Sequence, residues 1–120
     1  MYTDHIIFSD GSGTNGTTSS DLAQNFINII IGTSTGVVAN NFGGGVVDIS
    51  DYTSLSKSKL IRAVVGNDIN GTVAGYGGYV GVSGGVFNSL NNITTLTIFP
   101  CTGTSFNQYS QFALYGIKGA

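Results

Sequence analysis

The chain has 120 residues, of which 8% are charged, and its formal net charge is −2. That length corresponds to one ordinary domain, so we predict a single domain over residues 1–120. Four Lys and Arg residues are too few for a basic stripe that neutralises nucleic-acid phosphates or binds an anionic membrane, so we expect neither partner. The sequence has no apolar stretch of roughly 20 residues, as a spanning helix needs, and its first residues lack the pattern of a secretion signal.

Short apolar runs bounded by turn residues recur along the chain, and we expect each run to be a β-strand. Such spacing is typical of sandwiches and barrels. We therefore predict an all-β fold class, a single antiparallel β-sandwich of jelly-roll type. The expected strands, in chain order, are Asp4–Phe8, Phe26–Ile31, Gly45–Ile49, Leu60–Val65, Tyr79–Val82, Ile93–Phe99 and Phe112–Ile117.

Alternation of apolar and polar residues is clearest in two of these runs. In Thr95–Ile98 it predicts that Leu96 and Ile98 face the core, and a similar pattern occupies Val47–Ser50. A helix competes with a strand only over Asp21–Ile31, where the apolar spacing suits both. Because four isoleucines beside a phenylalanine suit a pleated surface better, we favour the strand.

Glycine and asparagine are concentrated between the apolar runs. The segments Asp10–Gly16, Asn40–Gly45 and Asn67–Gly71 are rich in residues that tolerate a positive φ, so we expect loops at the ends of the fold. The glycine-rich stretch Gly75–Gly85 is typical of a flat strand that approaches another backbone closely.

The glycine-rich segment Asp10–Gly16 also admits two ligand interpretations. Its three glycines have the spacing of a dinucleotide-binding loop, but the βαβ unit that such a loop needs is missing. Its oxygen-bearing side chains, with Asp21 as a second carboxylate, faintly resemble a calcium loop, although calcium sites collect more carboxylates. We therefore predict an ordinary solvated loop, with no cofactor and no metal.

No catalytic constellation emerges from the sequence. His5 is the sole histidine and lies beside Asp4 without a nucleophile motif, so we interpret it as a surface or packing residue. Cys101 is the sole cysteine and is interpreted as a small buried hydrophobe, with no internal disulfide. The six aspartates are scattered, although spacing alone does not exclude pairing in space. We predict a protein that is not an enzyme.

Three aromatic residues among glycines are the candidate contact residues. Tyr76, Tyr79 and Phe87 fit either a sugar-stacking platform or packing within a core or an interface. We favour packing, because aromatic side chains often fill space beside glycine in sheets.

The most specific residues lie near the carboxyl end, in Asn92–Pro100, Gly103–Phe106 and the run FALYGIK at Phe112–Lys118. This region resembles the terminal strand pair of tailed-bacteriophage structural proteins, in which an I-x-x-L-x-I strand precedes a loop and the chain finishes on F-x-L-Y-G-I-K. Upstream the resemblance is looser, and the segments Asp4–Phe8, Asp21–Asn28 and Ser50–Tyr52 fall in the expected order. The resemblance covers about the last 30 residues closely and supplies no catalytic residues.

The resemblance implies a jelly-roll-like sandwich in a virion, assembled in the host cytoplasm. Related proteins occur in capsid decoration, tail fibres and tail tips. We expect a capsid decoration or cement protein that reinforces the phage head, bound to the major capsid protein or other virion proteins. The alternative is a tail-fibre or tail-tip module that binds host-surface glycans. Since charge is scarce, we also expect a homo-oligomer, a trimer by symmetry matching, held mainly by apolar contacts.

Overall fold

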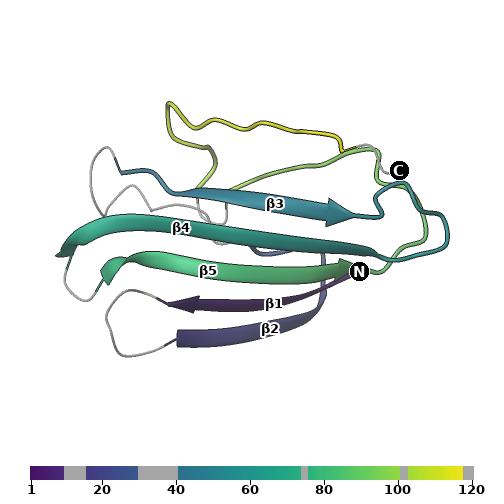
Figure 1. Ribbon diagram of the computed structural model, residues 1–120, viewed down its shortest axis with the longest axis horizontal. Helices are drawn as coiled ribbons and strands as arrows, with labels where there is room; N and C mark the ends of the chain where they lie inside the picture. The colour runs from purple at the N-terminus through teal and green to yellow at the C-terminus, as the bar shows by residue number, and fades with distance from the viewer. Residues whose placement is uncertain (10–15, 30–40, 74–75, 101–102, 118–120) are drawn as a thin grey trace.

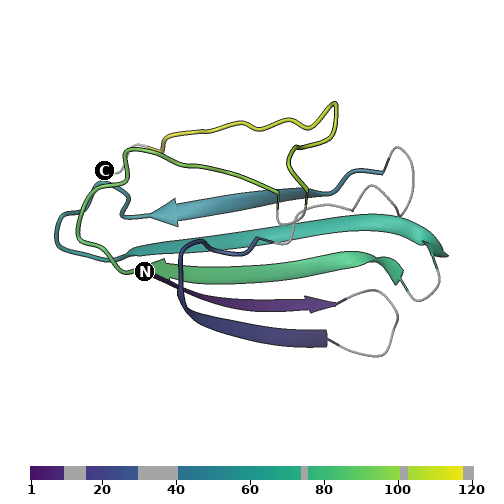
Figure 2. The same ribbon diagram turned by 180° about the vertical axis from the view of Figure 1, so that it is seen from behind.

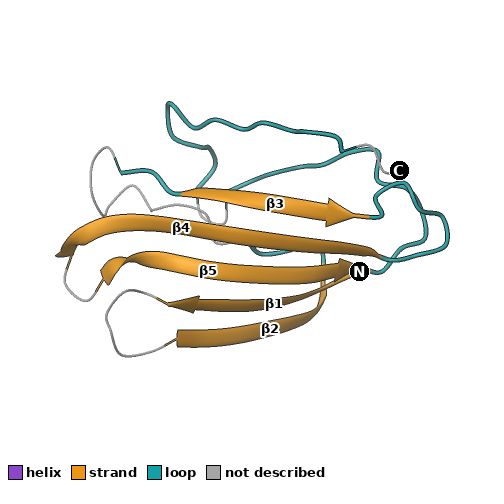
Figure 3. Cartoon of the chain, in the orientation of Figure 1, coloured by secondary structure: helices purple, strands orange, loops and turns teal. Residues whose placement is uncertain are grey.

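The computed structural model describes residues 1–9, 16–29, 41–73, 76–100 and 103–117. Within them, five strands form one antiparallel sheet in the order β2-β1-β5-β4-β3, shown in Figure 1. No helix occurs in these ranges, and so none that is long and apolar enough to cross a membrane (Figure 3). The predicted all-β, antiparallel fold class is confirmed. The strands are β1 Tyr2–Ser9, β2 Gly16–Gln24, β3 Gly44–Ser50, β4 Lys59–Val73 and β5 Tyr76–Phe87.

Four of the five strands, β1, β3, β4 and β5, contain a predicted run. Each has several apolar residues, whose side chains point to alternate faces of the pleated sheet. Strand β2 was not predicted. Its sequence GTTSSDLAQ is mostly polar, and it lies at one edge of the sheet, where backbone pairing with β1 alone holds it. An edge strand needs few apolar side chains, so its sequence gives little signal.

The predicted strands Ile93–Phe99 and Phe112–Ile117 are wrong, since both segments are irregular (Figure 3). Leu96 and Ile98, expected in the core, are 50% and 53% exposed. After β5 the chain leaves the sheet, and the Ile93 amide donates to the Tyr52 carbonyl at 2.8 Å in a loop. Apolar alternation makes a strand only where a neighbouring backbone pairs with it.

The segment after β2 also differs from its predicted strand. Asp21 belongs to the end of β2, while Asn25–Ile29 is irregular and crosses the sheet in front of β5 and β4 in Figure 2. The helix that competed there is absent from the described part, Asp21–Ile29. The rings of Phe26 and Phe99 meet edge to face at 5.7 Å. Irregular chain therefore forms a layer over one side of the sheet.

The predicted loop Asn67–Gly71 is wrong as well, because these residues lie inside the long strand β4. The Asn67 side chain accepts a hydrogen bond from the Tyr79 amide at 2.9 Å, so it takes part in the pairing with β5. The register then shifts between Asp68 and Val73. Turn-prone residues are accommodated here by an irregular ladder rather than by a loop.

The side of the sheet under this irregular layer, called the covered face below, holds the buried core of the described residues. Its buried apolar side chains are Ile6, Ile61, Ala63 and Val65. Gly85 lies against them, and a Cβ there would come within 2.9 Å of both Ile27 Cδ1 and the Thr3 carbonyl oxygen. The predicted close approach of the glycine-rich strand is confirmed at this position.

Candidate functional site

The opposite side of the sheet, called the bare face below, carries apolar side chains that remain in contact with water. No described segment passes in front of the strands in Figure 1, whereas Asn25–Ile29 crosses them in Figure 2. The large exposed apolar side chains here are those of Ile7, Val46, Leu60, Val64, Val80, Val82 and Val86. They come from β1, β3, β4 and β5, so the exposed apolar surface spans most of the sheet.

Strand β5 shows the difference between the two faces most directly. Val80 and Val82 are 67% and 53% exposed, while Gly81 and Ser83, the residues that alternate with them, are buried. In a solvent-facing antiparallel sheet the larger apolar residues normally point inward. The arrangement in β5 is the reverse, because its larger apolar side chains lie on the bare face and remain exposed.

Register aligns the residues of the bare face into rows that cross the sheet. Val46 pairs with Val64, Val64 with Val82, Val82 with Ile7, and Ile7 with Thr18. We call this set, Val46, Val64, Val82, Ile7 and Thr18, the valine row. Because paired residues on one face have Cβ atoms about 5 Å apart, the row forms a nearly continuous apolar strip.

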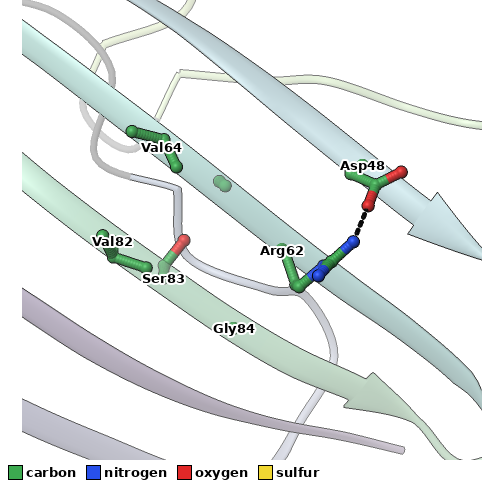
Figure 4. Close-up of a pocket in the computed structure, with 7 residues that line it drawn as sticks. Asp48, Arg62, Val64, Val82, Ser83 and Gly84 are labelled. Carbon is green, nitrogen blue, oxygen red and sulfur yellow. Dashed lines mark hydrogen bonds and ion pairs between the residues drawn. The ribbon is translucent and has the colours of Figure 1, made fainter.

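The next row is polar and contains a hollow. It runs through Asp48, Arg62, Gly84, His5 and Ser20 in register. An ion pair joins Arg62 and Asp48, and beside Arg62 the side-chain-free Gly84 leaves a hollow open to solvent (Figure 4). The opposite charges of Asp48 and Arg62 cancel. The bare face therefore has an apolar strip next to a polar row without net charge.

A second exposed apolar region follows β5. The segment 103–117 is irregular, and its Leu114 and Tyr115 side chains are 83% and 84% exposed. No charged residue occurs anywhere between Ile69 and Ile117. A chain this poor in charge has little protection against association through exposed apolar side chains.

The polar groups buried on the covered face are structural. The Lys59 ammonium, with the residue 0% exposed, donates to the carbonyl oxygens of Ser54, Lys57 and Ser89 at 2.7, 3.1 and 3.0 Å. The buried Asp4 carboxylate accepts the Asn28 amide at 2.9 Å. These contacts tie loops to the sheet.

The three candidate contact residues do not form one aromatic platform in the described part of the chain. The Phe87 ring stacks on Tyr2, with centroids 4.7 Å apart. Tyr79 lies on the same strand eight positions earlier, a separation of roughly 26 Å along the strand. The side chain of Tyr76 lies outside the described ones. The Phe87 ring thus packs against a side chain of the neighbouring strand β1.

The remaining candidate residues fall in different places. His5 is exposed on the bare face, and Asp4 pairs in register with Asp21, whose side chain lies outside the described ones. Cys101 and the loop Asp10–Asn15 also lie outside the described residues. Within those residues, no group of three His, Cys, Asp or Glu side chains is placed to hold a metal.

The sequence did not predict the bare face, because alternation of residues in a strand does not tell which set of side chains points into the core. Val80-Gly81-Val82-Ser83 alternates in the same way whether the valines point inward or outward. Comparisons with protein-family models, curated proteins and solved structures found no match.

Proposed function

We propose that this chain is a non-enzymatic structural subunit of a tailed-phage virion, which works by packing against other protein subunits. The observation that supports this proposal best is the reversed arrangement of β5, with Val80 and Val82 exposed and Gly81 and Ser83 buried. Burial of such a face in a subunit contact removes apolar area from water at about 25 cal/mol per Å². Contact with a partner subunit would bury the exposed valines and so explain why they lie on this face.

The resemblance of Asn92–Pro100 and Phe112–Lys118 to tailed-phage proteins supports a virion as the assembly. We propose a capsid decoration or cement protein that acts as a homotrimer on the head and contacts the major capsid protein. Because attachment depends on apolar contacts more than on charge, it should persist in about 1 M salt, where the Debye length is about 3 Å.

The test counts copies of the chain in purified particles by quantitative mass spectrometry, before and after a wash in about 1 M salt. Hundreds of copies that remain after the wash support a cement protein on the head. A few copies per particle support the alternative, a tail-fibre or tail-tip module. Absence of the chain from particles contradicts the virion proposal, and release by salt contradicts attachment through apolar contacts.

A further inference from the structure

The outer edge of β3 is open. This strand ends the sheet, so in the described part of the chain it pairs with β4 alone. An open edge exposes backbone N–H and C=O groups to other chains, and edge strands usually carry lysine, proline or a covering segment that blocks such pairing. Strand β3 has neither lysine nor proline, and Arg62 neutralises its one charged residue, Asp48. The remaining device is a covering segment.

The segment Ile93–Phe99 is tied beside this edge at both of its ends. The Ile93 amide donates to the Tyr52 carbonyl oxygen at 2.8 Å, two residues beyond the end of β3. The Phe99 ring contacts Phe26 at 5.7 Å. Between these contacts the chain runs beside β3 and opposite to its arrow in Figures 1 and 2. The sequence ITTLTIF is rich in strand-forming residues, so it suits an antiparallel partner of β3.

We propose that Ile93–Phe99 is a strap that closes onto the outer edge of β3 as a sixth strand of the sheet. The structure shows the strap open, held at its two ends. The closed strap involves a single chain, so it goes beyond the proposed function and needs no partner subunit. Its failure would leave the virion proposal standing, because that proposal rests on the bare face.

The direction of the backbone groups on β3 follows from a hydrogen bond across the sheet. In antiparallel pairs, residues that exchange hydrogen bonds alternate with residues that do not. The Asn88 amide donates to the Met1 carbonyl oxygen at 3.1 Å, at the next pair of the register between β5 and β1. Even-numbered residues of β5 therefore bond β1, and odd-numbered ones bond β4. Carried through the registers of β4, this alternation leaves the backbone groups of Val47 and Ile49 on the outer edge.

A bulge just after β3 sets the register of the strap. Asp51 has a φ of 55°, the left-handed conformation of the first residue in a G1 β-bulge, where two residues oppose one residue of the partner strand. Asp51 and Tyr52 then both lie opposite Ile93. The hydrogen-bonded pairs that follow are Thr95 with Ile49, Thr97 with Val47 and Phe99 with Gly45. Each pair uses a β3 residue whose backbone groups face outward, so the ladder can form.

The position of Phe99 supports this register independently. Its ring contacts Phe26, which belongs to the segment that crosses the covered face in Figure 2. The bulged register puts Phe99 on the covered face, because its partner Gly45 alternates with Val46 of the bare face. Without the bulge, Phe99 would lie opposite Val46 and turn to the bare face, away from Phe26.

Closure of the strap has two consequences. Ile98 comes to lie opposite Val46 on the bare face, where the two side chains are now 53% and 72% exposed. This contact extends the valine row by one residue. The strap also occupies the outward backbone groups of β3, so a strand from another chain cannot add there. Pro100 follows directly and lacks an N–H group, so it ends the sixth strand.

The first experiment measures amide hydrogen exchange of the wild-type chain, residue by residue, by NMR. In the closed strap the Thr95 and Thr97 amides donate to β3, whereas those of Thr94 and Leu96 point away. After correction for sequence, the two donating amides should exchange at least about tenfold more slowly than the other two. Slow exchange at Leu96 and Ile98 instead would overturn the bulged register. Equally fast exchange along the whole strap would overturn its closure.

The second experiment traps the closed strap with a disulfide in a Cys101→Ser background. Ile98→Cys with Val46→Cys forms a non-hydrogen-bonded pair with Cα atoms about 4.5 Å apart, which a disulfide spans. Ile98→Cys with Val47→Cys is the matched control, because Val47 is the next residue but faces the opposite side of the sheet. Mild oxidation should close the first pair within one chain at least about tenfold faster than the control pair.

The rate of thiol loss in the monomer band of a non-reducing gel reports the result. Equal rates, or a faster control pair, would overturn the register, and retention of free thiols in both pairs would overturn closure. The exchange experiment uses the wild-type chain, so it decides the matter even where a cysteine variant fails to fold.

Discussion

The two faces of the sheet differ although they are built from the same strands. On the covered face, residues are buried under other segments or held by hydrogen bonds. Gly85 lies close under Ile27, and the Lys59 ammonium donates to three carbonyl oxygens. On the bare face, valines stand in register without cover. The comparison shows that the folded chain buries the apolar side chains on only one side of this sheet. The other side is available for association, so substitutions should act differently on the two faces.

The largest expected effect on stability is on the covered face, at Lys59. Lys59→Met removes three hydrogen bonds from an ammonium and leaves three carbonyl oxygens short of a donor, so we expect a loss of about 3 kcal/mol in the free energy of unfolding. Lys57→Met is the control. Lys57 is exposed and lies 3.8 Å from Asp51, and its loss should cost less than about 1 kcal/mol. Urea denaturation at one protein concentration measures both, and equal losses would show that the buried ammonium has no special role.

The next effect compares two neighbouring glycines on opposite faces. Gly85→Ala brings a methyl group within 2.9 Å of the Thr3 carbonyl oxygen and Ile27 Cδ1, so it should destabilise the fold by about 2 kcal/mol. Gly84→Ala meets only the Ile61 carbonyl oxygen, at 3.8 Å, and should leave stability unchanged or raise it by up to about 1 kcal/mol. Thermal unfolding of both variants tests this contrast. A Gly84→Ala variant as unstable as Gly85→Ala would mean that the bare face is covered in the monomer.

A smaller effect is expected at Asp4, which joins the covered face to the segment above it. Asp4→Ala leaves the Asn28 amide without its 2.9 Å acceptor and should cost about 1 to 2 kcal/mol. His5→Ala changes the next residue, which is exposed on the bare face, and should cost less than about 0.5 kcal/mol. Urea denaturation would contradict the comparison if His5→Ala cost as much as Asp4→Ala.

The smallest effect concerns the ion pair of the bare face. Arg62→Gln removes the partner of Asp48, but both side chains are well exposed in the single chain. Such pairs contribute about 0 to 1 kcal/mol, and salt screens them. At a protein concentration at which the chain is monomeric, Arg62→Gln should therefore change the urea midpoint only slightly. A loss above about 2 kcal/mol there would show that the pair is buried in the single chain.

Several strands were predictable from the sequence because their signal is local. The run Leu60–Val65 lies in β4, and Val47–Ser50 alternates in β3 with Asp48 exposed, as its pattern indicated. Strand β2 was not predicted, because its sequence is mostly polar and it forms only by pairing with β1. The alternation at Leu96 and Ile98 predicted a strand wrongly, because no strand among the described residues pairs with this segment.

The candidate site was less predictable than the fold, for a physical reason. The alternation of β5 indicates a strand, but which face is covered depends on Asn25–Ile29, a segment more than 50 residues earlier in the chain. The aromatic residues Tyr79 and Phe87 looked like a contact site because of their type. The valines that face outward are common strand residues and gave no signal of their own.

The most direct test of the account is thiol labelling of single cysteines in a Cys101→Ser background. Val82→Cys places the thiol on the bare face, and Leu114→Cys places it outside that face. In the assembled protein, a maleimide reagent should label Leu114→Cys quickly and Val82→Cys at least tenfold more slowly, and dilution to monomers should restore fast labelling of Val82→Cys. Fast labelling of Val82→Cys in the assembled protein would contradict the claim that the bare face is buried in the assembly.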